Sequence, residues 1–219
     1  MEKSGKSYKT VEYNGFELIL DGNKLKRVTN PVPTKKDIHI PKILPSGDEI
    51  NLICSDFCEG EFGEISIDNR ISEIEPSAFF LSHVERVVWP CSCKTIPDNC
   101  FAFSSISCID NILDNVFDIG VAAFEHTPNL KKLIWPYKCT TIPELCFSGS
   151  NISDLRNLSN VTSIEMYAFR FAHHIKELDL SGSFVSFIGY KAFEGLLAKD
   201  VSLPYYLSKD NLSEIGWLL

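Results

Sequence analysis

An isoleucine followed five positions later by a phenylalanine occurs six times in this chain, at nearly constant intervals. Successive isoleucines are 22, 23, 23, 22 and 24 residues apart. The pairs are Ile74 with Phe79, Ile96 with Phe101, Ile119 with Phe124, Ile142 with Phe147, Ile164 with Phe169 and Ile188 with Phe193. A period of about 20–50 residues is typical of stacked repeats, because one such unit cannot bury its apolar face alone. We therefore predict a single elongated repeat domain.

A second apolar pair follows each isoleucine by 10 to 14 residues. These pairs are Val84/Val87, Ile106/Ile109, Leu130/Leu133, Ile152/Leu155, Ile175/Leu178 and Ala198/Val201. In stretches such as Val87-x-Trp89 and Leu178-x-Leu180, alternate residues are apolar. This period of two indicates a strand with one buried face. Each repeat is predicted to supply one short strand, and stacking places these strands in parallel on one side of the coil.

The other half of each repeat runs from the isoleucine to the phenylalanine. A small residue precedes each of these six phenylalanines, namely Ala78, Cys100, Ala123, Cys146, Ala168 and Ala192. A small side chain suits a segment that is crowded against its neighbour, so we predict a tightly wound turn or a short helical segment here. The dipeptides Trp89-Pro90 and Trp135-Pro136 are 46 residues apart, as are Cys100 and Cys146, which indicates duplication of a two-repeat unit.

Together, the I-x-x-x-A-F segment, the following L-x-x-L-x-L and the closing W-P or L-P resemble the BspA-like leucine-rich repeats, also called the Treponema pallidum type. The resemblance covers roughly residues 50 to 205. It implies a leucine-rich repeat solenoid, α/β or mainly β, that coils right-handedly. Parallel strands would lie on one face, and irregular or short helical turns on the other. Members of this family are known mainly as surface proteins of bacteria and parasitic protists, where they are implicated in adhesion and binding to host proteins.

The segment before the repeats has a different composition. Residues 1–50 contain the turn signals Asn14-Gly15 and Asp21-Gly22 between apolar residues, which predict an N-terminal β-cap of two or three antiparallel strands. Residues 51–205 are assigned to six or seven repeats of 21–24 residues, the first of them degenerate, with Ile53 and Cys58 in the isoleucine and phenylalanine columns. Residues 206–219 are predicted to be a C-terminal cap or tail: a terminal helix, a partner surface or a truncated end.

Composition excludes some classes of function. The 219 residues include 21 basic and 29 acidic side chains, and this net charge of −8 disfavours non-specific nucleic-acid binding. No apolar run approaches the ~18 residues that cross a membrane, so we expect no transmembrane segment. The polar N-terminus has no apolar core, so we expect no signal peptide. The sequence therefore favours the cytoplasm, whereas the family resemblance implies the cell surface.

Nothing in the sequence indicates catalysis. There is no G-x-S-x-G, phosphate-cradling glycine loop or H-E-x-x-H, so we predict no enzyme activity and no cofactor. His173-His174 is the only histidine pair and is assigned to a solvated loop. The eight cysteines are interpreted as scattered reduced thiols, with Cys100 and Cys146 as small buried side chains and no metal site. Cys108 is predicted to point outward from its strand.

The face formed by the stacked strands is the predicted binding surface, because repeated strands hold rows of outward side chains on a rigid platform. One predicted row is Arg86, Cys108, Lys132, Asp154, Glu177 and Asp200, and the next is Val88, Asp110, Ile134, Arg156, Asp179 and Ser202. The first half reads basic to apolar and the second half acidic, which suits a partner of opposite charge order. A solvated face with incidental charges is the alternative.

Three functional hypotheses follow. The first is a non-catalytic adhesin or surface-antigen-like module that binds a host or matrix protein. The second is an intracellular scaffold with a cytosolic protein partner, which the thiol content favours. An enzyme is the third and the least supported. Two interpretations are also open for Trp89 and Trp135. They could pack into the edge of the core, or they could stay exposed as anchors of an interface.

Overall fold

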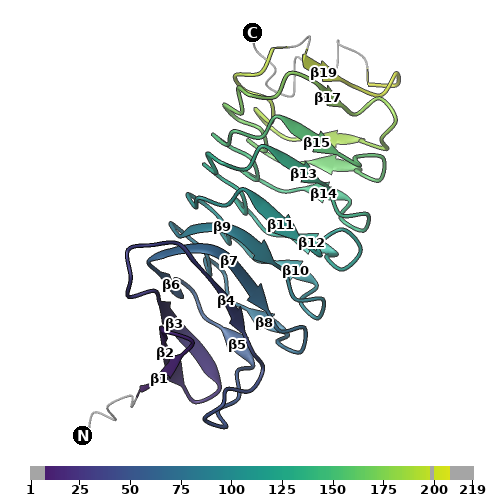
Figure 1. The fold of residues 1–219 in the computed structure, drawn as a ribbon. Helices are drawn as coiled ribbons and strands as arrows, with labels where there is room; N and C mark the ends of the chain where they lie inside the picture. The colour runs from purple at the N-terminus through teal and green to yellow at the C-terminus, as the bar shows by residue number, and fades with distance from the viewer. Residues whose placement is uncertain (1–7, 198–199, 208–219) are drawn as a thin grey trace, which may run out of the picture.

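The protein is an elongated β-solenoid, described here from a computed structural model that covers residues 8–197 and 200–207 (Figure 1). Its described residues contain no α-helix, and hence no helix long and apolar enough to cross a membrane. The chain enters through an antiparallel sheet and then winds in successive coils, each stacked on the one before. Ala198 and the predicted C-terminal segment from residue 208 onward lie outside the described residues.

The long face of the solenoid is built from one strand per coil, as the alternating pattern predicts. These strands are β4 (Lys36–Ile40), β7 (Glu61–Ile67), β9 (His83–Val88), β11 (Cys108–Asp110), β13 (Lys132–Ile134), β15 (Asp154–Arg156), β17 (Leu178–Asp179) and β19 (Val201–Ser202). All pairs among them are parallel, and Arg86 lies opposite Cys108, as Lys132 lies opposite Asp154. The predicted inward residues, such as Val87 and Leu133, are buried. We call this surface the strand face.

A second ladder of very short strands was not predicted. Each ends at a residue of the isoleucine column: β5 (Leu52–Ile53), β8 (Glu73–Ile74), β10 (Thr95–Ile96), β12 (Asp118–Ile119), β14 (Thr141–Ile142), β16 (Ser163–Ile164) and β18 (Phe187–Ile188). Each coil therefore supplies two strands, where the sequence indicated one. Two residues are too few to show an alternating apolar pattern, so periodicity could not reveal them.

The phenylalanine column forms a continuous stack through the core. From Phe79 to Phe193, successive rings lie 4.9 to 5.7 Å apart with interplanar angles of at most 17°. The two tryptophans close the edge of this core, because Trp89 and Trp135 are fully buried. Their indole nitrogens donate to the carbonyls of Cys93 (3.2 Å) and Cys139 (2.9 Å). Core packing of the tryptophans is therefore confirmed, and the exposed-anchor alternative is wrong.

The segment between isoleucine and phenylalanine is a tight turn and not a helix. In every repeat the third residue after the isoleucine has a positive φ, as in Asn99 (54°) and Tyr167 (58°). A left-handed residue interrupts a right-handed helix and costs roughly 1–2 kcal/mol. Hydrogen bonds to the next coil offset this cost: the amide of Asn99 donates to the carbonyl of Val121 (2.8 Å), and the amide of Phe101 to that of Ala123 (2.9 Å).

The first repeat differs from its prediction in one position. Ile53 lies in the isoleucine column, opposite Ile74. Phe57, and not Cys58, occupies the phenylalanine column: its ring lies 4.9 Å from that of Phe79, and its amide donates to the carbonyl of Ala78 (3.3 Å). This turn is one residue shorter than the others. Cys58 instead begins β6 (Cys58–Glu59) and pairs with the N-terminal sheet.

The N-terminal sheet contains the predicted antiparallel strands, β1 (Lys9–Tyr13), β2 (Phe16–Asp21) and β3 (Lys24–Thr29). Its last strand, β3, pairs in parallel with β5 and β6 and so joins the cap to the first coil. The following strand, β4, adds a layer to the strand face beside β7. Residues 36–40, placed in the cap by the sequence analysis, therefore contribute to the solenoid itself.

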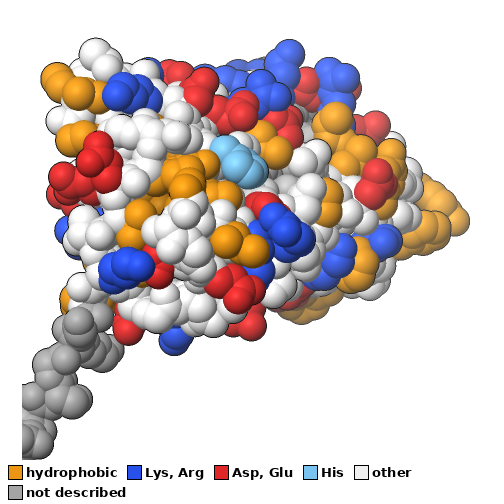
Figure 2. Space-filling model, turned by 60° about the horizontal axis from the view of Figure 1, so that its bottom comes forward, with side chains coloured by type: hydrophobic (Ala, Val, Ile, Leu, Met, Phe, Trp, Pro, Cys, Tyr) orange, Lys and Arg blue, Asp and Glu red, His pale blue; other side chains and the backbone are white. Residues whose placement is uncertain are grey.

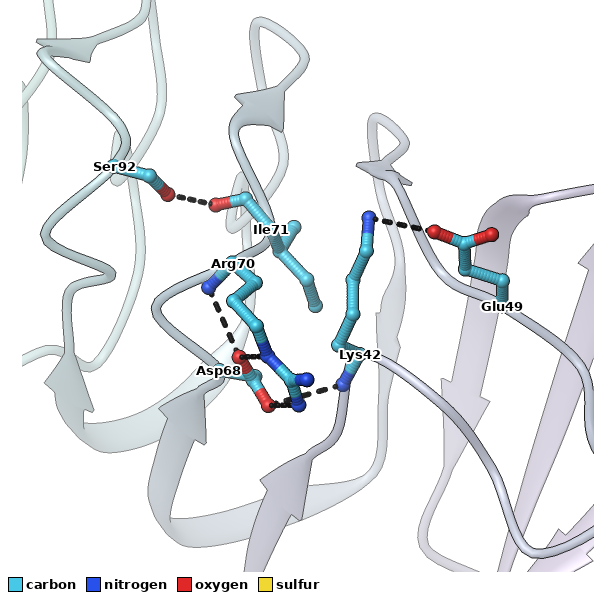
Figure 3. A network of polar contacts seen from close by, with 6 residues as sticks. All are labelled: Lys42, Glu49, Asp68, Arg70, Ile71 and Ser92. Atoms are coloured by element: carbon cyan, nitrogen blue, oxygen red, sulfur yellow. Dashed lines mark hydrogen bonds and ion pairs between the residues drawn. The ribbon is translucent and has the colours of Figure 1, made fainter.

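A polar network ties this layer to the coils (Figure 3). The carboxylate of Asp68, just after β7, accepts from the side chain of Arg70 (3.0 and 2.7 Å) and from the amide of Lys42 (3.3 Å). The Lys42 ammonium lies 3.3 Å from Glu49. In the next coil the hydroxyl of Ser92 donates to the carbonyl of Ile71 (2.5 Å). Hydrogen bonding to Arg70 holds the pKa of Asp68 well below its ordinary value.

Replacement of Asp68 by Asn is expected to destabilise the protein at pH 7 and to matter less in acid. Because the folded pKa lies below the unfolded one, the stabilisation is fully present above the unfolded pKa of about 3.9. It is lost as the pH falls through the folded value. We expect a loss of about 1 kcal/mol at pH 7, from weakened hydrogen bonds. Urea denaturation at pH 7 and pH 2 measures both, with exposed Asp114→Asn as control. An equal loss at both pH values would contradict the prediction.

Candidate functional site

The strand face carries most of the predicted binding residues at its surface. Arg86, Lys132, Ile134, Arg156, Glu177, Asp179 and Ser202 are exposed, and Val88, Cys108, Asp110 and Asp154 are half-buried. Asp200 is the exception, because only 8% of it is exposed. It lies just before β19, where its amide donates to the carbonyl of Leu197 (2.9 Å). Asp200 is therefore a poor candidate for a residue of this surface.

Charges on the strand face are paired within it. The guanidinium of Arg86 binds Asp110 in the next coil (2.5 Å) and lies 3.4 Å from Glu64 in the preceding one. Hydrogen bonding to Asp110 raises the pKa of Arg86. Arg156 likewise binds both oxygens of Asp154 (2.6 and 2.7 Å) and lowers the pKa of this carboxyl. These pairs remove much of the predicted basic-to-acidic gradient. Figure 2, in which the N-terminal end of the molecule comes forward, shows both signs of charge interspersed on that side as well.

Lys132 differs from these paired residues. Its ammonium makes no hydrogen bond or ion pair within the described part of the chain, although Lys132 lies opposite Asp154 in the parallel register. Both carboxylate oxygens of Asp154 are taken by Arg156, which is two residues away on the same strand. The charge of Lys132 therefore faces solvent on the strand face.

The ladder of the strand face is interrupted between repeat pairs. β9 pairs with β11, β13 with β15 and β17 with β19, whereas β11 and β13 are not paired, nor are β15 and β17. Where a pair continues, the residue after the strand donates onward, as Trp89 does to Asp110 (3.1 Å). At the interruptions this residue is Asn111 or Asn157, with φ of 65° and 68°. Asparagine tolerates this left-handed conformation, which turns the chain out of the strand direction.

The isoleucine ladder is interrupted for a different reason. Where this ladder is continuous, the amide of the residue after an isoleucine donates to the carbonyl of the isoleucine one coil earlier, as Gly120 does to Ile96 (2.8 Å). Pro97 and Pro143 occupy this position at the two breaks, β8 to β10 and β12 to β14, and proline has no N–H to donate. A surface pocket of about 570 Å³ lies at the first of these breaks, lined in part by Pro97.

A second pocket, of about 410 Å³, lies on the strand face at the break between β11 and β13. Its apolar lining is Ile109, Ile112, Leu113, Leu133 and Ile134. Its polar lining is Cys108, Asp110, Asn111, Lys132, Asp154 and Arg156. Six of the twelve predicted face residues are thus brought together around one hollow. The hollow itself was not predicted. The signal for it in the sequence was asparagine at positions 111 and 157, where the equivalent position after β9 has Trp89.

Cys108 is the one cysteine in the lining of the strand-face pocket. The thiol of Cys108 is half-buried and lies 3.7 Å from a carboxylate oxygen of Asp110. Burial, followed by the negative charge of Asp110, raises the pKa of Cys108 and disfavours the reactive thiolate. His173 and His174 are exposed, and the Nδ1 atom of His173 lies 3.0 Å from the carbonyl oxygen of Gly195. Within the described ranges, no three His, Cys, Asp or Glu side chains form a group that could hold a metal.

Four other cysteines are buried in the hydrophobic core. All eight cysteines are free thiols. Cys100 and Cys146 are fully buried beside the phenylalanine stack, as their column predicts, and burial raises their pKa. Burial also raises the pKa of Cys93 and of Cys139 to about 12. Such thiols pack as small apolar side chains.

Comparison with one solved structure agrees with the fold. A leucine-rich cell surface protein from Faecalibacterium prausnitzii superposes with a TM-score of 0.63 at 22% identity, over 85% of this chain and 52% of that one. Two further structures match with lower TM-scores. The pneumococcal vaccine antigen PcpA gives 0.45 at 17% identity, over 94% of this chain and 52% of that one. A leucine-rich repeat protein from Eubacterium ventriosum gives 0.36 at 16% identity, over 80% and 68%.

This chain spans about half the length of the first two of these proteins. No protein of curated function matches its sequence. The profile of the BspA-type leucine-rich repeat region, however, matches six copies, over residues 40–153 and 109–213. These matches cover nearly all the coils described above. The chain therefore belongs to the BspA-type leucine-rich repeat family.

Proposed function

We propose that this protein is a non-catalytic module that binds another protein through the strand face. The observation that carries the proposal is the clustering of exposed Lys132, Ile134 and Arg156 around a pocket on a rigid parallel sheet. A surface of fixed shape binds without the entropic cost of ordering loops. The absence of an activated nucleophile among the lining groups also favours binding over chemistry.

Two settings are open to such a module. The similarity to a bacterial leucine-rich cell surface protein supports a surface-antigen-like or adhesin role, with a host or matrix protein as partner. Eight free thiols support the alternative, an intracellular scaffold with a cytosolic protein partner, because reducing compartments preserve thiols. The binding surface is the same in both cases.

Paired charge-swap variants test the strand face. The face variant carries Lys132→Glu, Ile134→Ser and Glu177→Lys, three exposed positions without ion pairs in the described residues. The matched control carries Lys138→Glu, Val121→Ser and Asp118→Lys, exposed positions around the isoleucine ladder, and likewise leaves the net charge unchanged. Each protein is used to capture partners from a lysate of the source organism and from animal-cell extract with matrix proteins.

We expect the native chain and the control variant to capture the same partner, and the face variant to lose it. Thermal unfolding of all three proteins verifies that each is folded. Equal capture by the two variants would remove the strand face as the binding surface. The extract that yields the partner then distinguishes the two settings.

A further inference from the structure

The pocket between β11 and β13 combines an apolar floor with a single unpaired charge at its rim. Ile109, Ile112 and Leu133 are buried beneath it, and Ile134 stands beside it with 53% of its surface exposed. A hollow of about 410 Å³ is large enough for one or two side chains of a ligand. The floor therefore selects an apolar group.

The rim selects a charge. Of its four charged side chains, Asp110 is bound by Arg86, and Asp154 and Arg156 bind each other. These ionic groups are already compensated, so a ligand gains little by approaching them. Among these four, Lys132 alone has no hydrogen bond or ion pair in the described structure, because the two carboxylates of the rim are bound by Arg86 and Arg156. An anionic group on the ligand would complete its charge pairing.

The interruption of the ladder also limits the shape of the ligand. No backbone hydrogen bond joins β11 to β13 in the described residues. Asn111 turns the chain away at the end of β11. The residues of β11 and β13 nevertheless stay in contact, which leaves no room for a further strand between them. The hollow therefore takes side chains from a segment that lies across the strand face.

We propose that the partner of the strand face docks an extended segment here, with an apolar side chain in the pocket and a neighbouring carboxylate on Lys132. This inference rests on the proposed function and specifies the ligand chemistry of that surface. The segment is an acidic, apolar peptide motif from another protein. A second copy of this chain or a basic segment would be other occupants of the same hollow.

Synthetic peptides of about eight residues, enough to cross neighbouring strands spaced ~4.8 Å apart, provide the probe. Each has a Gly-Ser background with two variable neighbouring positions: Leu-Asp, Leu-Lys, Ser-Asp or Ser-Ser. Binding to the full chain in solution is measured by the fluorescence polarisation of labelled peptides. We expect Leu-Asp peptides to bind about tenfold more tightly than each of the others, because both the floor and the rim are then satisfied.

Two variants of the protein sharpen the result. Lys132→Glu should reverse the preference, so that Leu-Lys peptides bind better than Leu-Asp peptides. Cys108→Tyr should fill the hollow and weaken all Leu-containing peptides alike. Lys138→Glu, an exposed lysine outside the strand face, should leave the preference unchanged. Thermal unfolding of each variant shows that the fold is retained.

The inference is overturned if Leu-Asp peptides bind no better than Ser-Ser peptides, or if Lys132→Glu leaves their preference intact. The inference is also overturned if the protein dimerises with rising concentration and Cys108→Tyr abolishes this dimerisation. The occupant of the pocket would then be a second copy of this chain. Such failures are separable from failure of the proposed function. Partner capture that depends on Glu177, outside the pocket, would keep the strand face as the binding surface while removing the acidic, apolar motif.

Discussion

Replacing Phe124 by alanine should lower the free energy of unfolding by about 3–5 kcal/mol, the range for aromatic truncation in a packed core. Phe124 is fully buried, and its ring stacks on those of Phe101 (5.7 Å) and Phe147 (5.6 Å). Its removal leaves both neighbouring rings with one unpacked face, and a repeat array has no distant contacts that could compensate.

Guanidinium denaturation measures this loss. Phe103→Ala is the matched control, because it removes the same aromatic ring from the surface of a turn, where 45% of the residue is exposed. Phe103 stacks on His126 (4.7 Å) but fills no space in the core. We expect the control to cost less than about 1 kcal/mol. Equal losses for the two variants would show that the phenylalanine column is not the main support of the solenoid.

Gly120→Ala should cost about 3 kcal/mol, the upper end of the range for overpacking. Gly120 follows Ile119, and a Cβ atom there would meet the backbone nitrogen of Asp98 and lie 2.7 Å from the carbonyl carbon of Pro97. Backbone atoms cannot rotate away, so the two coils would have to separate. Separation would also lengthen two hydrogen bonds: from the amide of Gly120 to the carbonyl of Ile96 (2.8 Å), and from the amide of Val121 to the Asp98 carboxylate (2.8 Å).

The control is Gly182→Ala, where no atom lies within 4 Å of the added Cβ and φ is not positive. Alanine there should leave stability unchanged or raise it slightly by restricting the unfolded chain. Gly189→Ala tests the same geometry three repeats later, because its Cβ would meet the backbone of Met166 and Glu165. Melting temperatures that match the native protein for Gly120→Ala and Gly189→Ala would refute the close approach of these coils.

The interaction between neighbouring coils also explains one error of the sequence analysis. Counting five residues from Ile53 placed Cys58 in the phenylalanine column, but the turn is one residue shorter and Phe57 fills it. The constant count fails where β3 is available to pair with Cys58, since the N-terminal sheet competes for this segment. The repeat period by itself contains no information about such competition.

The sequence by itself determined the repeat, the inward and outward sides of each strand and the buried columns, because periodicity reports directly which residues avoid water. Arg86 and Cys108 stand opposite each other as their spacing predicts. Only the tertiary structure decided how these rows differ from one coil to the next. Asn111, with its left-handed backbone, interrupts the ladder of the strand face. Arg86 and Arg156 bind the carboxylates of Asp110 and Asp154. Lys132 is left without an ion pair beside an apolar hollow. Backbone dihedrals and side-chain pairings between coils set these features, and neither leaves a periodic trace in the chain.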